Sequence, residues 1–320
     1  MLDTALIATV AAVIREGSFE RAALALHVTP SAVSQRIRII EDRVGAVLII
    51  RGQPCAATEA GARLCRHADT VLMLEEGLRR EMPSLAPASG PGGQARVRVA
   101  INADSLGTWF MAALQSFQGP GSALIDLVVD DQDKTSDWLR RGHVLAAVTS
   151  LASPVQGCRS RKLGLLRYCA CASPQFVQRW FAAGLTVDAF ATAPSLVFDH
   201  NDRLQQQWVR RLLRKEVVLP AHRIPSTQGF VDATVAGIGW AMNPLQLVAD
   251  HLESGRLVEL ALDRRLDVAL YWQQVKLPLP ELDRLRQNVL AVADRALFHY
   301  SGLAPESFTA LAHLGISARR

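Results

Sequence analysis

Residues 18–44, SFERAALALHVTPSAVSQRIRIIEDRV, predict two short helices joined by a brief turn. The first helix is rich in alanine, the turn is His27-Val28, and the second helix is expected over residues 29–43. The hydroxyl of Thr29 can accept a hydrogen bond from an unpaired N–H group at the helix start, and Pro30 in the first helical position loses no hydrogen bond. Because alanine lets two crossing helices approach closely, this stretch predicts a helix-turn-helix.

The second helix of this motif has an apolar face and a polar face. At helical spacing the apolar face carries Val33, Ile37, Ile40 and Val44, and the opposite face carries Ser31, Ser34, Gln35, Arg38 and Asp42. A small, polar and basic face can enter the major groove of DNA, where glutamine pairs with adenine and arginine with guanine or phosphate. We therefore predict DNA contacts from Thr29, Ser31, Ser34, Gln35, Arg36 and Arg38. The alternative is an ordinary solvated amphipathic helix.

The composition is that of a well-packed globular protein of basic character. The 320 residues are 49% apolar and 20% charged, with a net charge of +5 and a pI of about 9.2. At roughly 100–200 residues per domain, this length predicts two or three folding units. Between Arg21 and Arg66 seven arginines accompany three acidic residues, so the local basic excess lies where DNA would bind.

The cysteines and the first residues of the chain bear on its compartment. Five cysteines, an odd number without CxxC spacing, predict reduced thiols instead of disulfides or a zinc site. Residues 4–14 are apolar like the core of a signal peptide, but Asp3 precedes them, Arg15-Glu16 follow, and no small-residue cleavage site is present. No stretch reaches the roughly 18 uninterrupted apolar residues of a membrane span. We expect a cytoplasmic protein without a membrane partner.

A segment rich in proline and glycine, PSLAPASGPGG at residues 83–93, divides the chain. Its composition excludes regular structure and predicts a hinge. Before it, residues 59–82 predict one long helix with an apolar stripe at coiled-coil spacing, formed by Leu64, Ala68, Val71, Leu78 and Met82. The stripe packs either on its own domain or on a second copy, and the small size of the first domain favours the second copy.

Beyond the hinge, apolar runs alternate with helical patterns. Strands are predicted at residues 97–101, 125–129 and 146–148, with helices at 106–117 and 135–141 between them. This alternation predicts a parallel α/β sheet. The whole chain is therefore expected to be an α+β multi-domain protein.

Several polar residues of the second half follow predicted strands. Ser105 lies at one expected helix N-terminus, and Ser226 or Thr227 at another, where backbone N–H groups favour a carboxylate. Simple helix capping is the alternative at each position. Residues 197–202, VFDHND, supply Asp199, His200 and Asp202 either to a surface turn or to a polar contact at the interface between lobes.

The sequence bears on two other classes of protein, enzymes and solute-binding receptors. Ser105, His200 and Asp199 could form a nucleophilic set, but the chain has no G-x-S-x-G elbow, no usable metal-ligand spacing and no phosphate-binding loop, which argues against an enzyme. The second half alone would suit a solute-binding receptor. The helix-turn-helix and the expected absence of a signal peptide favour a ligand sensor instead.

The motif residues also carry a family resemblance. GSFERAA at 17–23, LHVTPSAVSQRI at 26–37, and TEAG at 58–61 resemble the LysR-type transcriptional regulators. The resemblance implies a winged helix-turn-helix, a long dimerisation helix and a two-lobed α/β effector domain like that of periplasmic binding proteins. In the wing, Ile49 stands where the family usually has Phe, and Pro54-Cys55-Ala56 replace a commonly basic strip. A minor-groove contact is therefore implied only at Arg51.

The second half resembles one subgroup of that family. NADS at 102–105, RRG at 140–142, FDH at 198–200 and YW at 271–272 are similar to regulators that sense lysine or arginine and control export of basic amino acids. The resemblance implies that Ser105 and Thr227 hold the α-carboxylate of L-lysine or L-arginine, and that Asp104, Asp130 or Asp199 faces its cation. The full predicted effector site is Asp104, Ser105, Asp130, Thr149, Asp199, His200, Ser226 and Thr227. The alternative is a LysR-type regulator of another small carboxylate-bearing effector.

The resemblance also implies boundaries and partners. We expect the DNA-binding domain at 1–58, the dimerisation helix at 59–82, the hinge at 83–94, the effector domain at 95–300 and a tail at 301–320, with lobe I at about 95–165 and 273–300 and lobe II at about 166–272. The expected partners are double-stranded promoter DNA with two-fold related half-sites, further copies of the chain in a homodimer or homotetramer, and RNA polymerase. No cofactor and no metal are expected.

Overall fold

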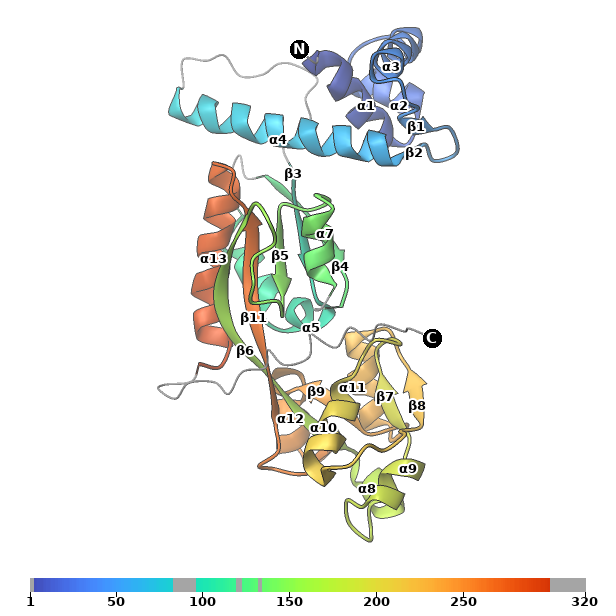
Figure 1. Cartoon of the computed structure of the whole chain (residues 1–320), viewed down its shortest axis with the longest axis vertical. Coiled ribbons are helices and arrows are strands. Elements are labelled where there is room, and N and C mark those ends of the chain that lie inside the picture. Colours follow the sequence, from blue (N-terminus) through green and yellow to red (C-terminus); the bar gives the residue numbers. More distant parts are fainter. Residues whose placement is uncertain (1–2, 83–95, 119–122, 132–133, 300–320) are drawn as a thin grey trace, which may run out of the picture.

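The computed structural model describes residues 3–82, 96–118, 123–131 and 134–299 (Figure 1). The predicted hinge at 83–94 and the predicted tail at 301–320 lie outside these residues. The described chain forms a small N-terminal helical unit, one long helix, and two lobes below it (Figure 1).

The N-terminal unit confirms the predicted helix-turn-helix. Thr29 is the N-cap of the second helix and accepts a hydrogen bond from the Ala32 N–H at 3.2 Å. The helix ends at Val44, because Gly45 takes a left-handed φ of 69°, and Val44 in the last turn is 40% exposed instead of buried as expected. The elements are α1 (Thr4–Glu16), α2 (Phe19–Ala25), α3 (Pro30–Val44), β1 (Ile49–Ile50) and β2 (Ala56–Ala57).

The long helix α4 (Glu59–Glu81) does not present its apolar stripe as one continuous surface. Leu64 and Ala68 pack into the core of the helix-turn-helix unit, because α1 lies directly against this part of α4. Further along, Met73 is buried in the core of the following lobe. Leu78 and Met82 remain about half exposed, at 49% and 47%. Only the second half of the stripe is therefore left for a second copy.

The sheet of the second half is mixed. Strand β3 (Arg96–Ile101) pairs in parallel with β4 (Leu124–Val129) and β5 (Ala146–Thr149), as predicted. Strands β6 (Cys158–Ala172) and β11 (Leu266–Val275) are long and antiparallel to their neighbours. The chain leaves the first lobe along β6 and returns along β11, so these two strands must run in opposite directions (Figure 1). The order is β10-β6-β11-β5-β3-β4, with β9 also on β6.

Lobe I surrounds the parallel strands, and lobe II lies at the far ends of β6 and β11 (Figure 1). Lobe I contains β3 (Arg96–Ile101), α5 (Ala103–Ser105), the π-helix η1 (Leu106–Phe110), α6 (Met111–Gln115), β4 (Leu124–Val129), α7 (Thr135–Arg140), β5 (Ala146–Thr149) and α13 (Pro280–Ala296). The connecting strands are β6 (Cys158–Ala172) and β11 (Leu266–Val275). Lobe II contains α8 (Pro174–Trp180), α9 (Val187–Thr192), β7 (Ser195–Val197), α10 (Leu204–Leu213), β8 (Ala221–Arg223), α11 (Thr227–Val235), β9 (Ala241–Pro244), α12 (Leu245–Glu253) and β10 (Val258–Glu259).

The five cysteines all have free thiols. Among the described residues, no helix is both long and apolar enough to cross a membrane. The same part of the chain contains no group of three or more His, Cys, Asp and Glu side chains that could hold a metal ion.

Gly61 of α4 lies close to the backbone of Leu48, just before β1. A Cβ atom at Gly61 would lie 2.0 Å from the backbone oxygen of Leu48, whereas one at Gly77 of the same helix would meet only the Pro280 side chain, at 3.2 Å. Gly61→Ala is expected to lower the free energy of unfolding by about 1–3 kcal/mol, because backbone must move to relieve the overlap. Thermal denaturation of the full chain measures this, with Gly77→Ala as the matched control. Equal melting temperatures for the two variants would contradict the prediction.

Candidate functional site

The outer face of α3 is open to solvent and polar. Ser31, Ser34, Gln35 and Arg38 are exposed, and Arg36 is half-buried at the edge of this face. The hydroxyl of Ser31 lies 2.9 Å from that of Thr29, which holds both groups at the start of the helix. This face presents an amide, a guanidinium and small hydroxyls without a bulky apolar group, as a major-groove reader requires.

The wing is short and fastened to the helices. The Leu48 N–H donates to Glu41 Oε1 at 2.8 Å, and the Cys55 N–H donates to the Gly17 oxygen at 2.8 Å. Arg51 is exposed, and its guanidinium carbon lies 5.5 Å from the centre of the Phe19 ring. Arg51 is therefore placed at the surface beside the helix-turn-helix, where a phosphate or a minor groove can reach it.

A cavity opens between the two lobes at the carboxyl ends of β3 and β4. Its empty space, including the mouth that is open to solvent, is about 780 Å³. Both lobes contribute to its wall, which is mostly polar. The lining residues are Asn102, Ala103, Asp104, Asp131, Phe198, Asn201, Asp202, Arg203, Leu204, Gln207, Thr227, Phe230, Met242, Asn243 and Pro244.

Asp104 is the lining carboxyl with the most unusual environment. It is half-buried, and the Tyr168 hydroxyl donates to Asp104 Oδ2 at 2.7 Å. Burial raises the pKa of Asp104 to about 6, with further increases from the negative charges of Asp202 and Asp131, while the hydroxyls of Tyr168 and Thr227 lower it. A cation in the cavity would offset both the cost of burying a charged Asp104 and its repulsion by Asp202 and Asp131.

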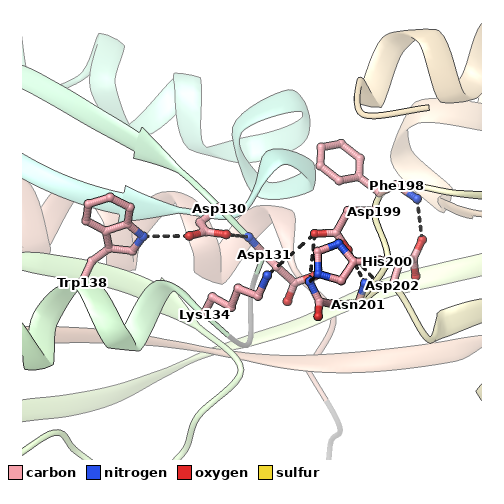
Figure 2. A network of polar contacts seen from close by, with 9 residues as sticks. All are labelled: Asp130, Asp131, Lys134, Trp138, Phe198, Asp199, His200, Asn201 and Asp202. Carbon is pink, nitrogen blue, oxygen red and sulfur yellow. Dashed lines mark hydrogen bonds and ion pairs between the residues drawn. The ribbon is translucent and has the colours of Figure 1, made fainter. Parts of the chain in front are cut away.

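Asp202 is a second carboxyl of this wall and comes from lobe II. It accepts hydrogen bonds from the N–H groups of Phe198 at 2.9 Å and Leu204 at 3.1 Å (Figure 2 shows the Phe198 bond). Burial raises the pKa of Asp202 as well, although these two backbone donors oppose the rise. Asp202 is therefore fixed in position, and burial disfavours its charged form beside the cavity.

Some polar atoms near the cavity are buried without a protein partner. Asn102 Oδ1 and Asn243 Oδ1 belong to lining residues and accept no hydrogen bond within the described chain, and Ser105 Oγ lies one residue beyond the lining Asp104 in the same condition. The Thr227 hydroxyl approaches Asp104 closely enough to lower its pKa, yet makes no hydrogen bond of good geometry. Because buried polar atoms are normally satisfied, these groups indicate a place for a polar ligand or water.

Two of the predicted acids are engaged outside the cavity wall (Figure 2). Asp130 accepts hydrogen bonds from Trp138 Nε1 and from the Asp131 N–H, both at 2.8 Å. Asp199 accepts from the Asn201 N–H at 2.6 Å and lies 3.9 Å from the Lys134 ammonium, an ion pair that joins the two lobes. Of the acids predicted to face a cation, only Asp104 lines the cavity.

The remaining predicted effector residues have local roles. Thr149 is buried and accepts from the Leu151 N–H at 3.2 Å, and Ser226 caps α11 by accepting from the Gly229 N–H at 3.1 Å. His200 is exposed, and its ring nitrogen lies 3.2 Å from Asn201 Nδ2. Ser105 Oγ has no partner among the described residues, so the nucleophilic set with His200 and Asp199 is not formed.

Sequence reasoning missed several residues of the cavity wall, and also Tyr168, which donates to the lining Asp104. Asn102 comes directly after β3 and Asp131 two residues after the end of β4, and ligands commonly bind at the carboxyl ends of parallel strands, so this rule could have found both. Asn243 and Tyr168 lie inside strands, and their sequence neighbours give no comparable signal.

Comparison with known families finds matches to both halves of the chain. The model of the bacterial regulatory helix-turn-helix protein, lysR family, matches residues 5–62, and the LysR substrate binding domain matches residues 90–294. The chain is 44% identical over 292 residues to the HTH-type transcriptional regulator LysG of Mycobacterium tuberculosis, covering 91% of this chain and 94% of the relative. It is 40% identical over 302 residues to ArgP of Pseudomonas aeruginosa, covering 94% and 99%.

Solved structures give the same result. The crystal structure of ArgP from Mycobacterium tuberculosis superposes with a TM-score of 0.74 at 43% identity, covering 93% of this chain and 99% of that one. Full-length LysG from Corynebacterium glutamicum with bound effector Arg superposes with a TM-score of 0.63 at 34% identity, covering 92% and 99%. The likeness thus includes the helix-turn-helix, the long helix and both lobes.

Proposed function

The chain belongs to the LysR family of DNA-binding transcriptional regulators and is not an enzyme, and from this premise we propose that it senses L-lysine or L-arginine in the cavity between its lobes. The observation that carries the proposal is the acidic wall of that cavity. Asp104, Asp131 and Asp202 converge on it from both lobes, and the lining includes only one cationic side chain, Arg203, among the described residues. An ammonium or guanidinium group is the natural complement of such a wall.

The rest of a basic amino acid also finds partners in this cavity. The guanidinium of Arg203 can pair with an α-carboxylate, and the Thr227 hydroxyl, predicted to hold that group, lines the same space. Asn102 Oδ1 and Asn243 Oδ1 are unoccupied acceptors for an α-ammonium. The bound arginine of the Corynebacterium glutamicum relative supports this class of effector. Carboxylate binding by Ser105 stays a prediction.

Effector binding would act through the two strands that join the lobes. Because residues from both lobes line the cavity, a ligand that touches both walls binds the closed arrangement more tightly than an open one. This difference in affinity is what can shift the arrangement of paired DNA-binding units. The exposed Leu78 and Met82 of α4 are available for a second copy of the chain.

The wider setting follows the predictions from sequence. We propose a homodimer or homotetramer in the cytoplasm that binds promoter DNA with two-fold related half-sites and contacts RNA polymerase as an activator. A gene for a basic amino acid exporter, or for related metabolism, is the proposed target. The domain boundaries near residues 58, 82, 94 and 300 also stay predictions.

Titration calorimetry on the full chain tests the effector. We expect binding heat with L-arginine or L-lysine, and binding of L-citrulline weakened by at least about a hundredfold, because citrulline matches arginine in shape but lacks the cation. Agmatine keeps the guanidinium but lacks the α-carboxylate, so its affinity tests whether the cavity also binds the carboxylate. Binding of neutral amino acids without any binding of lysine or arginine would contradict the proposal and favour another carboxylate-bearing effector.

A further inference from the structure

Tyr168 occupies a special place on the strand that joins the lobes. In the sheet it lies opposite Leu266 of β11 and Pro244 of β9. It is therefore the last residue of β6 that pairs with β11 and the first that pairs with β9 of lobe II. The side chain is 1% exposed, and its hydroxyl reaches Asp104 at the start of α5 in lobe I. One buried tyrosine thus links the connecting strand to the acidic wall.

The tyrosine acts as the donor in this contact. Burial and the neighbouring Asp104 raise the pKa of Tyr168 well above its ordinary value, so the phenol keeps its proton. A hydrogen bond from a neutral donor favours the charged form of a carboxyl group and also fixes its orientation. Tyr168 therefore both favours the charged form of Asp104 and fixes the orientation of this carboxyl group, which lines the cavity.

The charged groups around Asp104 come from three elements. Asp131 follows β4, and Asp202 precedes α10, and both oppose a negative charge on Asp104. The Thr227 hydroxyl at the start of α11 favours that charge, as Tyr168 does. Arg203, beside Asp202, lines the cavity and is exposed. Without an added cation, the acidic groups make the charged form of Asp104 unfavourable.

We propose that Tyr168 is a positioning residue of the effector site, which orients the Asp104 carboxyl toward the cavity and sets the pH at which it can receive a cationic effector. The inference rests on the proposed sensing of a basic amino acid. When the cation binds, a protonated Asp104 releases its proton to solvent and the carboxylate takes the cation in its place. Effector affinity is therefore linked to proton release.

The sign of the pH dependence follows from the raised pKa of Asp104, about 6. Above this value the carboxylate is ready for the cation, and below it the affinity should fall by up to about tenfold per pH unit, since a proton must leave first. Tyr168→Phe keeps the ring but removes the donor, so the pKa of Asp104 should rise further. The fall in affinity should then begin about one pH unit higher.

Calorimetry with L-arginine between about pH 5 and pH 8.5, in buffers of different ionisation enthalpy, measures both affinity and protons released. We expect Tyr168→Phe to weaken binding about fivefold near pH 6 and nearly tenfold at about pH 5, to approach the wild type at the highest pH, and to release more protons near neutral pH. Tyr271→Phe, which changes the other described tyrosine, on β11, should match the wild type. Near-ultraviolet circular dichroism checks that both variants are folded.

Each alternative result is informative. Equal weakening by Tyr168→Phe at every pH would reduce Tyr168 to a packing role and overturn the inference, and so would a wild-type affinity that does not change with pH. In both cases arginine still binds, so the proposed function stands. Absence of binding by every basic amino acid at every pH would instead overturn the proposed function, and the inference with it.

Discussion

Asp104→Asn is expected to weaken binding of L-lysine or L-arginine by about a hundredfold at pH values above 6, equivalent to roughly 3 kcal/mol. The substitution keeps the size of the side chain and an oxygen that can accept from Tyr168, but removes the charge that would pair with the cation. In a partly buried wall such a pair is poorly replaced by water. Calorimetry measures the loss, and gel-shift titration measures the matching loss of effector response on DNA.

Asp199→Asn is the matched control for this prediction. Asp199 is also a carboxyl between the lobes, but it does not line the cavity and its oxygens are engaged by Asn201 and Lys134. We expect it to change effector affinity only a few-fold, as for an exposed ion pair worth about 1 kcal/mol or less. The reverse order, with Asp199→Asn the more damaging, would show that the wrong acid has been assigned to the cation.

The same Asp104 substitution should stabilise the empty protein. Because the pKa of Asp104 is raised from 3.8 to about 6, the folded chain holds this proton more tightly than the unfolded chain. Its contribution to stability therefore falls as the pH rises from about 4 to about 6, when the buried group becomes charged. Asp104→Asn should raise the free energy of unfolding by up to about 3 kcal/mol at neutral pH, and by nothing below about pH 4. Melting temperatures across this range measure the difference.

Helix α3, whose polar face is predicted to contact DNA, could be predicted because the signals that define it are local. Thr29 caps the helix, Pro30 begins it, and Val33, Ile37 and Ile40 repeat at a spacing that fixes its buried face. None of these signals depends on a distant part of the chain. The one misplaced residue, Val44, lies where Gly45 ends the helix, and helix ends are set by only the last turn.

The strand directions and the cavity wall could not be read in the same way. Strand β6 pairs antiparallel with β11 because the chain returns from lobe II to lobe I along β11, and this return lies about a hundred residues further along the sequence. Asp104, Asp202 and Asn243 share one wall although about a hundred residues separate the first two, and nothing local relates them. Asp130 and Asp131 differ by one position. The Trp138 N–H engages Asp130, while Asp131 lines the cavity.

Gln35→Ala should weaken binding to the operator by about 1–3 kcal/mol, or roughly 5- to 150-fold, while leaving binding to random DNA nearly unchanged. Gln35 is exposed on the second turn of α3, where an amide can pair with the N6 and N7 groups of adenine. Its removal leaves a base edge without a partner but takes away no positive charge. Gel-shift titration and footprinting on the DNA upstream of the protein's own gene, beside a random duplex, measure the two affinities.

Two further variants separate base reading from backbone attraction. Gln115→Ala removes an exposed helical glutamine from lobe I and should leave both affinities unchanged. Arg38→Ala removes a charge: if Arg38 reads guanine, the loss is confined to the operator, whereas a phosphate contact weakens all duplexes alike and lowers the salt dependence. Gln35 carries no charge, so an equal loss on operator and random DNA for Gln35→Ala would mean a hydrogen bond to phosphate. In that case sequence recognition must rest on other residues of the α3 face, first Ser34 and Arg38.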